Sequence, residues 1–364
     1  MLQHGKPHGS VYMTGSTKDE ISIGECDRCN PILARVIRGD AVESVHRGSA
    51  VVVDTRGGTV FSWGDPGRLI YPRSAYKFIQ GIPLLESGTA DALGLGERDI
   101  ALACASHNAE PMHTERVTAW LDRLGLSDGD LECGAALPQH DATAHELIRA
   151  GRQAERKHHN CSGKHVGMLM LAHHLGQPTS GYSDYEHPTQ KAWRRVMSEM
   201  IGLDTELLQW ERDGCGMPAL CMPMNALARG YAQFANCADF PAQRATAMKR
   251  ILSSIVRYPE MIAGTGRCCT AVIEKTGGRV LVKTGAEGVF AGVVPERGIG
   301  FALKVDDGAT RGSEVALGGL LGALEVLRKE EVDALSPWFR PAVRNSQDYV
   351  TGWIEPSAEW TSRQ

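Results

Sequence analysis

The first residues of this chain that could do chemistry are a serine and a lysine three positions apart, Ser74 and Lys77. They lie in residues 71–77, YPRSAYK, where a proline and a serine favour the start of a helix. Side chains three positions apart on a helix share a face. A lysine that is buried or close to a second cation can lose its proton and activate a serine hydroxyl as a nucleophile. The spacing alone also allows a capping serine followed by a solvated lysine.

A second serine and a second lysine occur further along the chain. Lys283 stands near the end of a predicted strand, with the small residues Thr284 and Gly285 after it, so a ligand could lie against the strand edge. Its charge would lower the pKa of Lys77 if the two amines were close. Residues 106–108, Ser-His-Asn, supply another serine and only approximately match a Ser-x-Asn motif. Ser-x-x-Lys, Ser-x-Asn and Lys-Thr-Gly in this order resemble the pattern of serine β-lactamases and penicillin-binding proteins.

Cysteines next to glycines suggest a metal site. Cys161 and His165 open a predicted helix, and Cys215 lies between two glycines in a loop. Thiolates and imidazoles are the ligands that zinc prefers, so the spacing predicts a zinc site with these three residues. Buried thiols in loops are the alternative. Cys26 and Cys29 lack a second pair, and we interpret them as incidental.

The composition excludes several classes of protein. The chain has 364 residues, 42% hydrophobic and 23% charged, which is typical of a globular protein. A net charge of −4 without a basic run argues against a nucleic-acid partner, and no apolar run suits a membrane helix. Residues 1–30 read as a disordered extension without a secretory signal, so we expect a cytoplasmic protein with its ten cysteines reduced. The adjacent Cys268 and Cys269 are expected to be a buried thiol pair in a strand.

The hydrophobic pattern predicts an α+β fold. Apolar residues alternate or run together near both ends of the chain, and they recur at three- and four-residue spacing in the middle. The predicted strands are 36–38, 43–46, 50–54, 60–63, 270–274, 280–284, 289–294 and 299–305. The predicted helices are 113–124, 141–152, 164–175, 189–201, 224–234, 241–257 and 312–328, and the sequence after Pro337 allows no assignment. We therefore expect one antiparallel sheet built from N- and C-terminal strands around a large helical insert.

Five segments in order resemble one family, the rhizobial-type or thermolabile-type L-asparaginases, also called the asparaginase II family. They are 71–77 (YPRSAYK), 103–110 (ACASHNAE), 160–167 (NCSGKHVG), 213–218 (DGCGMP) and 283–288 (KTGAEG), within a resemblance that runs from about residue 30 to 338. The resemblance implies a β-lactamase-like fold, related to serine β-lactamases, penicillin-binding proteins and glutaminases. It also implies a homodimer. We expect a single catalytic unit over 31–364, with 31–73 and 270–330 in the sheet part and 74–260 in the helical part.

The resemblance also implies roles for individual residues. Two serine–lysine pairs, Ser74 with Lys77 and Ser106 with Lys283, would meet in one pocket. A zinc ion would be held by Cys161, Lys164 and Cys215, with Lys164 in place of the His165 that spacing favours. Because a lysine amine binds metal only when neutral, an unusually low pKa of Lys164 is implied. Arg73, His165 and Asp213 would lie near the amino-acid end of the substrate.

The expected reaction is the hydrolysis of L-asparagine to L-aspartate and ammonia. Ser74 would attack the amide carbon while Lys77, neutral beside Lys283, takes its proton and Ser106 relays a proton to the leaving ammonia. The two serines could exchange roles. The zinc would help to hold the substrate rather than activate water.

Three other functions remain open at this point. A penicillin-recognising serine hydrolase shares the serine and lysine motifs. A glutaminase differs by one methylene of substrate, which a pocket distinguishes by only about 1–3 kcal/mol. A zinc-dependent amino-acid-binding protein would keep the site without catalysis.

Overall fold

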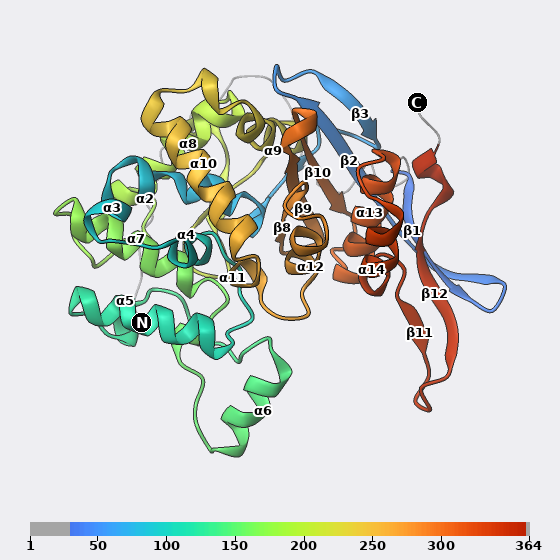
Figure 1. Ribbon diagram of the computed structural model, residues 1–364, viewed down its shortest axis with the longest axis horizontal. Helices are drawn as coiled ribbons and strands as arrows, with labels where there is room; N and C mark the ends of the chain where they lie inside the picture. The colour runs from blue at the N-terminus through green and yellow to red at the C-terminus, as the bar shows by residue number, and fades with distance from the viewer. Residues whose placement is uncertain (1–29, 362–364) are drawn as a thin grey trace, which may run out of the picture.

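An antiparallel sheet forms the centre of the computed structural model, which describes residues 30–361 (Figure 1). Its strand order is β11-β12-β1-β2-β10-β9-β8, and β3 pairs with β2 outside this order. The strands are β1 (Ile32–Arg38), β2 (Ala41–Asp54), β3 (Thr59–Trp63), β8 (Leu281–Gly285), β9 (Val289–Val294), β10 (Ile299–Val305), β11 (Ala342–Arg344) and β12 (Val350–Pro356). The prediction of one sheet built from both ends of the chain is confirmed. The predicted extension and its Cys26 and Cys29 lie outside the described residues, whereas Asn30 is buried and bonds to Asp306.

Strand β2 connects the two ends of the sheet. Its first half, 41–47, pairs with β1, and its second half, 48–54, pairs with β10. Gly48 stands where the partner changes, and a Cβ there would lie 2.2 Å from the Lys304 carbonyl oxygen. Only glycine allows the strands to approach so closely.

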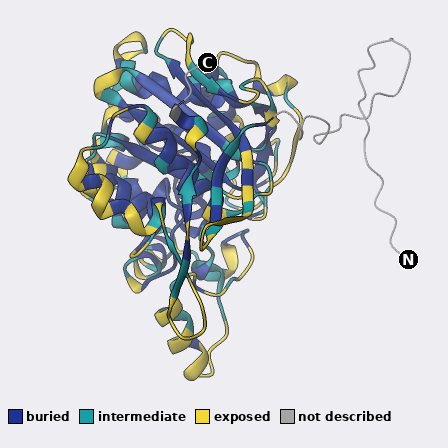
Figure 2. Cartoon of the chain, turned by 90° about the vertical axis from the view of Figure 1, so that its right-hand side faces the viewer, coloured by how far each residue is buried: buried dark blue, intermediate teal, exposed yellow. Residues whose placement is uncertain are grey.

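Helices cover the sheet on both faces, which explains why its central strands are largely apolar. Every residue of β9 is buried. Helix α9 (Met224–Ala232) packs on β2, β9 and β10, and helix α13 (Thr310–Ala323) packs on β1, β10 and β12 (Figure 1). Figure 2 shows buried residues on strands and helices of the interior and exposed residues mainly on outer helices and loops.

Most of the remaining helices lie between β4 and β8, a region that extends past the predicted helical part, 74–260, to include α12. They are α1 (Lys77–Gln80), α2 (Ile82–Glu86), α3 (Thr89–Ala92), α4 (Glu97–Ala103), α5 (Pro111–Leu124), α6 (Asp141–Arg149), α7 (Ser162–His174), α8 (Pro188–Ile201), α10 (Ala242–Arg257), α11 (Glu260–Ala263) and α12 (Cys268–Lys275). Two small sheets join β4 (Leu69–Ile70) to β7 (Met222–Pro223) and β5 (Trp210–Arg212) to β6 (Pro218–Leu220). Within the described part of the chain, no helix has the length and apolar character needed to cross a membrane.

Two predictions of secondary structure were wrong. Residues 270–274, predicted as a strand, belong to α12, so Cys268 and Cys269 are a buried pair of free thiols in a helix. Residues 268–273 are buried at every position, and a short apolar run buried on all sides has no periodicity that separates a strand from a helix. The helix predicted over 312–328 ends at Ala323, and a second helix, α14 (Lys329–Phe339), leads into the unpredicted strands β11, at the edge of the sheet, and β12 beside it.

Candidate active site

Ser74 lies in η1 (Arg73–Tyr76), a 3-10 turn that leads into α1. The first hydrogen bond of the turn runs from Ala75 N to Pro72 O (3.0 Å), so the proline and not the serine caps it. Gly285, at the end of β8, packs against this turn, and a Cβ there would lie 2.2 Å from Pro72 O. The close approach of strand and turn brings Ser74 beside the strand end that carries Lys283.

Two buried lysines converge on the second serine, Ser106. Its Oγ lies 2.9 Å from Lys283 Nζ and 3.0 Å from Lys77 Nζ. Both lysines are fully buried, and Ser106 is only 4% exposed. Within residues 30–361 no hydrogen bond joins Ser74 to either lysine. The structure therefore brings together Ser106, Lys77 and Lys283, and leaves Ser74 nearby without a bond to Lys77.

The two lysines differ in their surroundings. Burial and, secondly, the charge of Lys77 lower the pKa of Lys283 to about 7. Besides Ser106, Lys283 Nζ has one oxygen partner, the carbonyl of Thr284 at 2.9 Å. These two partners suit a neutral amine, which has two N–H donors and one lone pair. An N–H can donate to the Thr284 carbonyl oxygen, and the lone pair can accept the Ser106 hydroxyl proton.

Lys77 has a fuller set of acceptors. Its Nζ donates to the Ala105 carbonyl oxygen, to Ser106 Oγ, and to Cys161 Sγ at 3.1 Å. These three acceptors match the three N–H donors of an ammonium group. The geometry therefore suits a charged Lys77 beside a Lys283 that can lose its proton.

The segment after α4 holds Ser106 through backbone bonds to two other parts of the helical region. Ser106 N donates to Ile262 O (2.9 Å), and His107 N donates to Asn160 O (3.0 Å). The His107 ring lies 3.0 Å from Ser162 Oγ, and burial holds its pKa well below the ordinary value. His107 is thus neutral, and its ring joins this segment to Ser162 at the start of α7.

Ser74 and Ser106 open onto one cavity of about 190 Å³. Its other polar side chains were not recognised from the sequence as site residues; they are Gln139, Asn160, Arg267, Thr284, Thr310 and Glu314. Asn160 and Thr284 fall inside two of the motifs quoted above. The other four stand singly in segments with no recognisable motif, so only the fold brings them together.

Cys161, Lys164 and Cys215 also meet, at the start of α7. Lys164 Nζ lies 3.3 Å from Cys215 Sγ, and Lys77 Nζ lies 3.1 Å from Cys161 Sγ. The side chains of Cys161, Lys164 and Cys215 are all buried. The interaction between the two sulfurs, with help from the Lys77 and Lys164 charges, holds the pKa of Cys161 well below its ordinary value and raises that of Cys215.

These residues fit a zinc ion by type and by place. Two sulfurs and one nitrogen that are buried together can supply three of the four ligands that zinc takes. In the described part of the chain, no three His, Cys, Asp or Glu side chains form a metal-binding group, and the nitrogen beside these sulfurs is Lys164 Nζ. Burial lowers the pKa of Lys164, but the Cys215 and Cys161 sulfurs outweigh it and the pKa is raised. A metal ion bound here would displace that proton.

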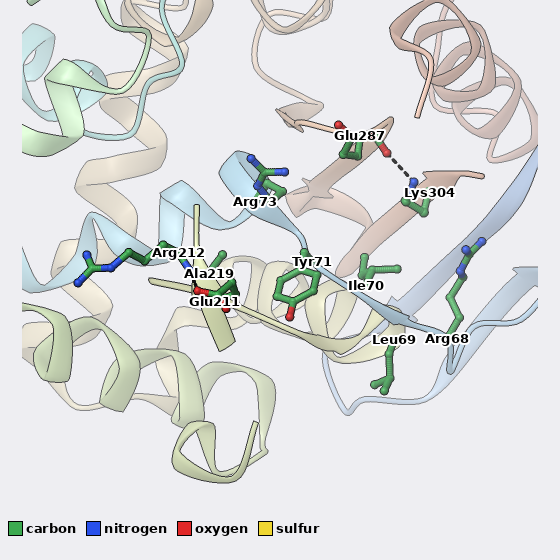
Figure 3. A pocket seen from close by; sticks show the side chains of 10 residues that line it. All are labelled: Arg68, Leu69, Ile70, Tyr71, Arg73, Glu211, Arg212, Ala219, Glu287 and Lys304. Atoms are coloured by element: carbon green, nitrogen blue, oxygen red, sulfur yellow. Dashed lines mark hydrogen bonds between the residues drawn. The ribbon is translucent and has the colours of Figure 1, made fainter. Parts of the chain in front are cut away.

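Arg73 and Asp213 form an ion pair next to this cluster. Arg73 Nε lies 2.7 Å from Asp213 Oδ1. Arg73 has a φ of 53°, a strained conformation for a residue with a side chain. It lines a second cavity of about 420 Å³, together with Tyr71, Glu287 and Lys304 (Figure 3). That cavity is separate from the one onto which the two serines open.

His165 is fully buried behind the cluster. Its Nδ1 lies 2.8 Å from the Tyr182 hydroxyl, and Nε2 has no hydrogen-bond partner among the residues described. Burial and the Lys164 charge hold its pKa well below the ordinary value, so the ring is neutral. It lines neither cavity.

Three solved structures are similar to this chain at low sequence identity. A candidate β-lactamase from Bacteroides dorei has a TM-score of 0.41 and 12% identity, covering 71% of this chain and 84% of its own. A β-lactamase from Mycobacterium bovis has a TM-score of 0.38 and 13% identity, covering 80% and 94%. A class C β-lactamase has a TM-score of 0.37 and 12% identity, covering 73% and 89%.

No curated protein matches the chain. The sequence profile of L-asparaginase II, by contrast, matches residues 34–356, which is most of the sequence. The predicted resemblance is confirmed by this match, and the chain belongs to the L-asparaginase II family of amidohydrolases.

Proposed function

We propose that this protein hydrolyses L-asparagine to L-aspartate and ammonia by a serine–lysine mechanism. Membership of an amidohydrolase family supports the reaction and a small-molecule substrate. The observation that carries the mechanism is Ser106 Oγ, which lies within hydrogen-bond distance of two buried lysines at the wall of a cavity shared with Ser74.

Lys283 is the base in this proposal. Its pKa of about 7 leaves a large neutral fraction near neutral pH, and its Nζ is 2.9 Å from the hydroxyl that must lose a proton. Lys77 donates to the same oxygen and stabilises the negative charge that develops on it. This arrangement favours the exchange of roles that the sequence left open, with Ser106 as the nucleophile in place of Ser74.

The steps then follow from these groups. Ser106 Oγ bonds to the amide carbon as its proton passes to Lys283. The C–N bond breaks, Lys283 returns the proton to the nitrogen, and ammonia leaves an aspartyl ester on Ser106. Water attacks the ester with Lys283 again as the base, which releases L-aspartate and restores the hydroxyl.

Ser74, which lines the same cavity, stabilises the tetrahedral intermediate in this mechanism. Its N–H precedes the first hydrogen bond of η1 and is the donor that we assign to the oxyanion. Its hydroxyl supplies a second donor. The N–H of Ser106 is already bonded to Ile262 O and is not assigned this role.

A zinc ion held by Cys161, Lys164 and Cys215 is the cofactor that we propose. When bound, it would supply a positive charge that helps to hold the substrate near the serines. Arg73 and Asp213, which are bonded to each other, would then stabilise the loop that carries Cys215. The serine and lysines provide the nucleophile without it.

A cytoplasmic homodimer is the form that we propose for the protein in the cell. The cysteines among the described residues are all free, which agrees with a reducing compartment. The dimer rests on the family resemblance, and sedimentation velocity of the full chain tests it.

The decisive experiment is ammonia release from L-asparagine and L-glutamine by the purified chain and by Ser106→Ala and Ser74→Ala variants. We expect release from asparagine that the Ser106 variant loses. Binding of asparagine without ammonia release would favour an amino-acid-binding protein, and turnover of nitrocefin in its place would favour a penicillin-recognising hydrolase.

A further inference from the structure

An amino-acid substrate brings an ammonium and a carboxylate group into the cavity, and each needs a partner when water is excluded. In the proposed mechanism, the serines and lysines act on the side-chain amide of the substrate. Arg73 and Asp213 are bonded to each other, and neither lines the cavity onto which the serines open. Two other charged residues of this cavity, Glu314 and Arg267, have no part in the mechanism above.

Glu314 has an isolated carboxylate. It projects from α13 into the wall of the cavity, one helical turn from Thr310, which lines the same wall. No hydrogen bond or ion pair with another residue in the range 30–361 reaches its carboxylate. Burial raises the pKa of this carboxyl to about 7, and the Arg267 charge only partly offsets that effect. An enclosed carboxylate without a partner is unfavourable, and a cation in the cavity would restore its charged form.

Arg267 presents a cation to the same cavity. It precedes α12, after a loop in which Gly264 and Gly266 have φ values of 102° and 73°. One guanidinium nitrogen donates to Gln139 Oε1 at 2.7 Å, which holds the side chain at the cavity wall. The other guanidinium N–H groups are available for a planar, bidentate contact with a carboxylate.

The two charges share the cavity without pairing. Arg267 influences the pKa of Glu314, so the groups are near each other, yet among the described residues they form no ion pair within 4.0 Å. Opposite charges that stay apart in one cavity suit a ligand that carries both charges itself. The serines line the same cavity and would receive the uncharged side chain.

We propose that Glu314 binds the α-ammonium group and Arg267 the α-carboxylate of the substrate, and that the pair makes the enzyme specific for free amino acids. This inference rests on the asparaginase activity proposed above. Both residues are binding residues, which touch the substrate but take no part in proton transfer.

Substrates that lack one charge test each contact separately. Succinamic acid is asparagine without its amino group, and 3-aminopropanamide is asparagine without its carboxylate. We expect Glu314→Gln to raise the KM for L-asparagine about tenfold or more and the KM or inhibition constant of 3-aminopropanamide likewise, while succinamic acid is unaffected. Arg267→Met should affect L-asparagine and succinamic acid, and not 3-aminopropanamide. Glu330→Gln, an exposed carboxylate in the first turn of α14, is the matched control and should change none of them.

Each result decides the assignment. Equal changes for all three compounds in one variant, or no change for L-asparagine, would overturn it, because a lost contact affects only ligands that make it. The analogues are also measured as inhibitors, so slow turnover does not prevent the test. If the unmodified chain releases no ammonia, the proposed function fails independently. Calorimetric binding of L-aspartate to the same variants then tests the pair, with unchanged affinity counting against it.

Discussion

Lys283 Nζ lies 2.9 Å from Ser106 Oγ, although 177 residues separate the two along the chain. The contact joins β8 of the sheet to the segment that follows α4 in the helical part. Both side chains are buried, so water does not screen the amine from Lys77, which approaches the same oxygen. The fold thus places a serine where one lysine donates to it and the other can accept its proton.

The first prediction concerns pH. Lys283 must be neutral to accept the Ser106 proton, and its pKa is lowered to about 7. We expect kcat at saturating L-asparagine to rise about tenfold per pH unit below this value and to level off above it. Ammonia release measured from about pH 5 to about pH 9 checks this. A flat profile through neutral pH would show that Lys283 is not the base.

The second prediction concerns the stability of the same lysine. In the unfolded chain its pKa returns to about 10.4, so folding at neutral or acidic pH must force a proton off or bury a charge. The cost is greatest below about pH 7 and disappears as the pH approaches 10. We expect Lys283→Met to abolish turnover and to raise the melting temperature at pH 6, with a gain that shrinks toward pH 10. A lower melting temperature at every pH would contradict this.

The third prediction separates the two serines. Ser106→Ala removes the hydroxyl between the two lysines and should lower kcat by about a thousandfold or more. Ser74→Ala removes a donor to the intermediate and should lower kcat by about a hundredfold. Mass spectrometry of the enzyme quenched during turnover locates the aspartyl ester. An ester found on Ser74 would reverse the roles, and near-normal turnover by Ser74→Ala would remove that residue from the site.

The fourth prediction concerns the metal. Cys215→Ser should lower the zinc content of the purified protein and raise the KM for L-asparagine, while kcat at saturating substrate stays within a fewfold. The reason is that the proposed zinc orients substrate and supplies no nucleophile. Cys237→Ser, a buried cysteine bonded only to Phe234 O, is the control for removing a thiol. Complete loss of kcat with a folded protein would assign the metal to the chemistry.

Local signals explain how much of the fold the sequence could predict. Helices α5 and α8 end just before Gly125 and Gly202, which have positive φ values, and the predicted helices end at the same residues, 124 and 201. Strands β9 and β10 were predicted with their observed bounds because turn residues flank them. Strands β11 and β12 were missed because the irregular sequence becomes extended only when β12 pairs with β1 and β11 pairs with β12.

The candidate site likewise contains residues that local signals predict and residues that only the fold reveals. Ser106 and Lys283 could be predicted as site residues because each stands in a recognisable motif. The contact of Lys77 with Ser106 could not be found, because the direction of a long buried side chain depends on which acceptors the fold places around it. Arg267 and Glu314 carry no local signal at all, since their relevance arises only from a cavity formed by distant segments.

The fifth prediction tests how the sheet is held against the helical part. A Cβ on Gly300 of β10 would lie 2.2 Å from Ala228 O and from Ala232 N in α9, and both are backbone atoms that cannot move aside. We expect Gly300→Ala to destabilise the protein by about 1–3 kcal/mol or more, because α9 must shift away from the strand. Gly322→Ala in α13 is the matched control: nothing lies within 4 Å of its Cβ, and its helical position should gain about 0.5–1 kcal/mol. Urea denaturation of both variants measures the difference, and equal midpoints would show that the contact between α9 and β10 is looser than the structure indicates.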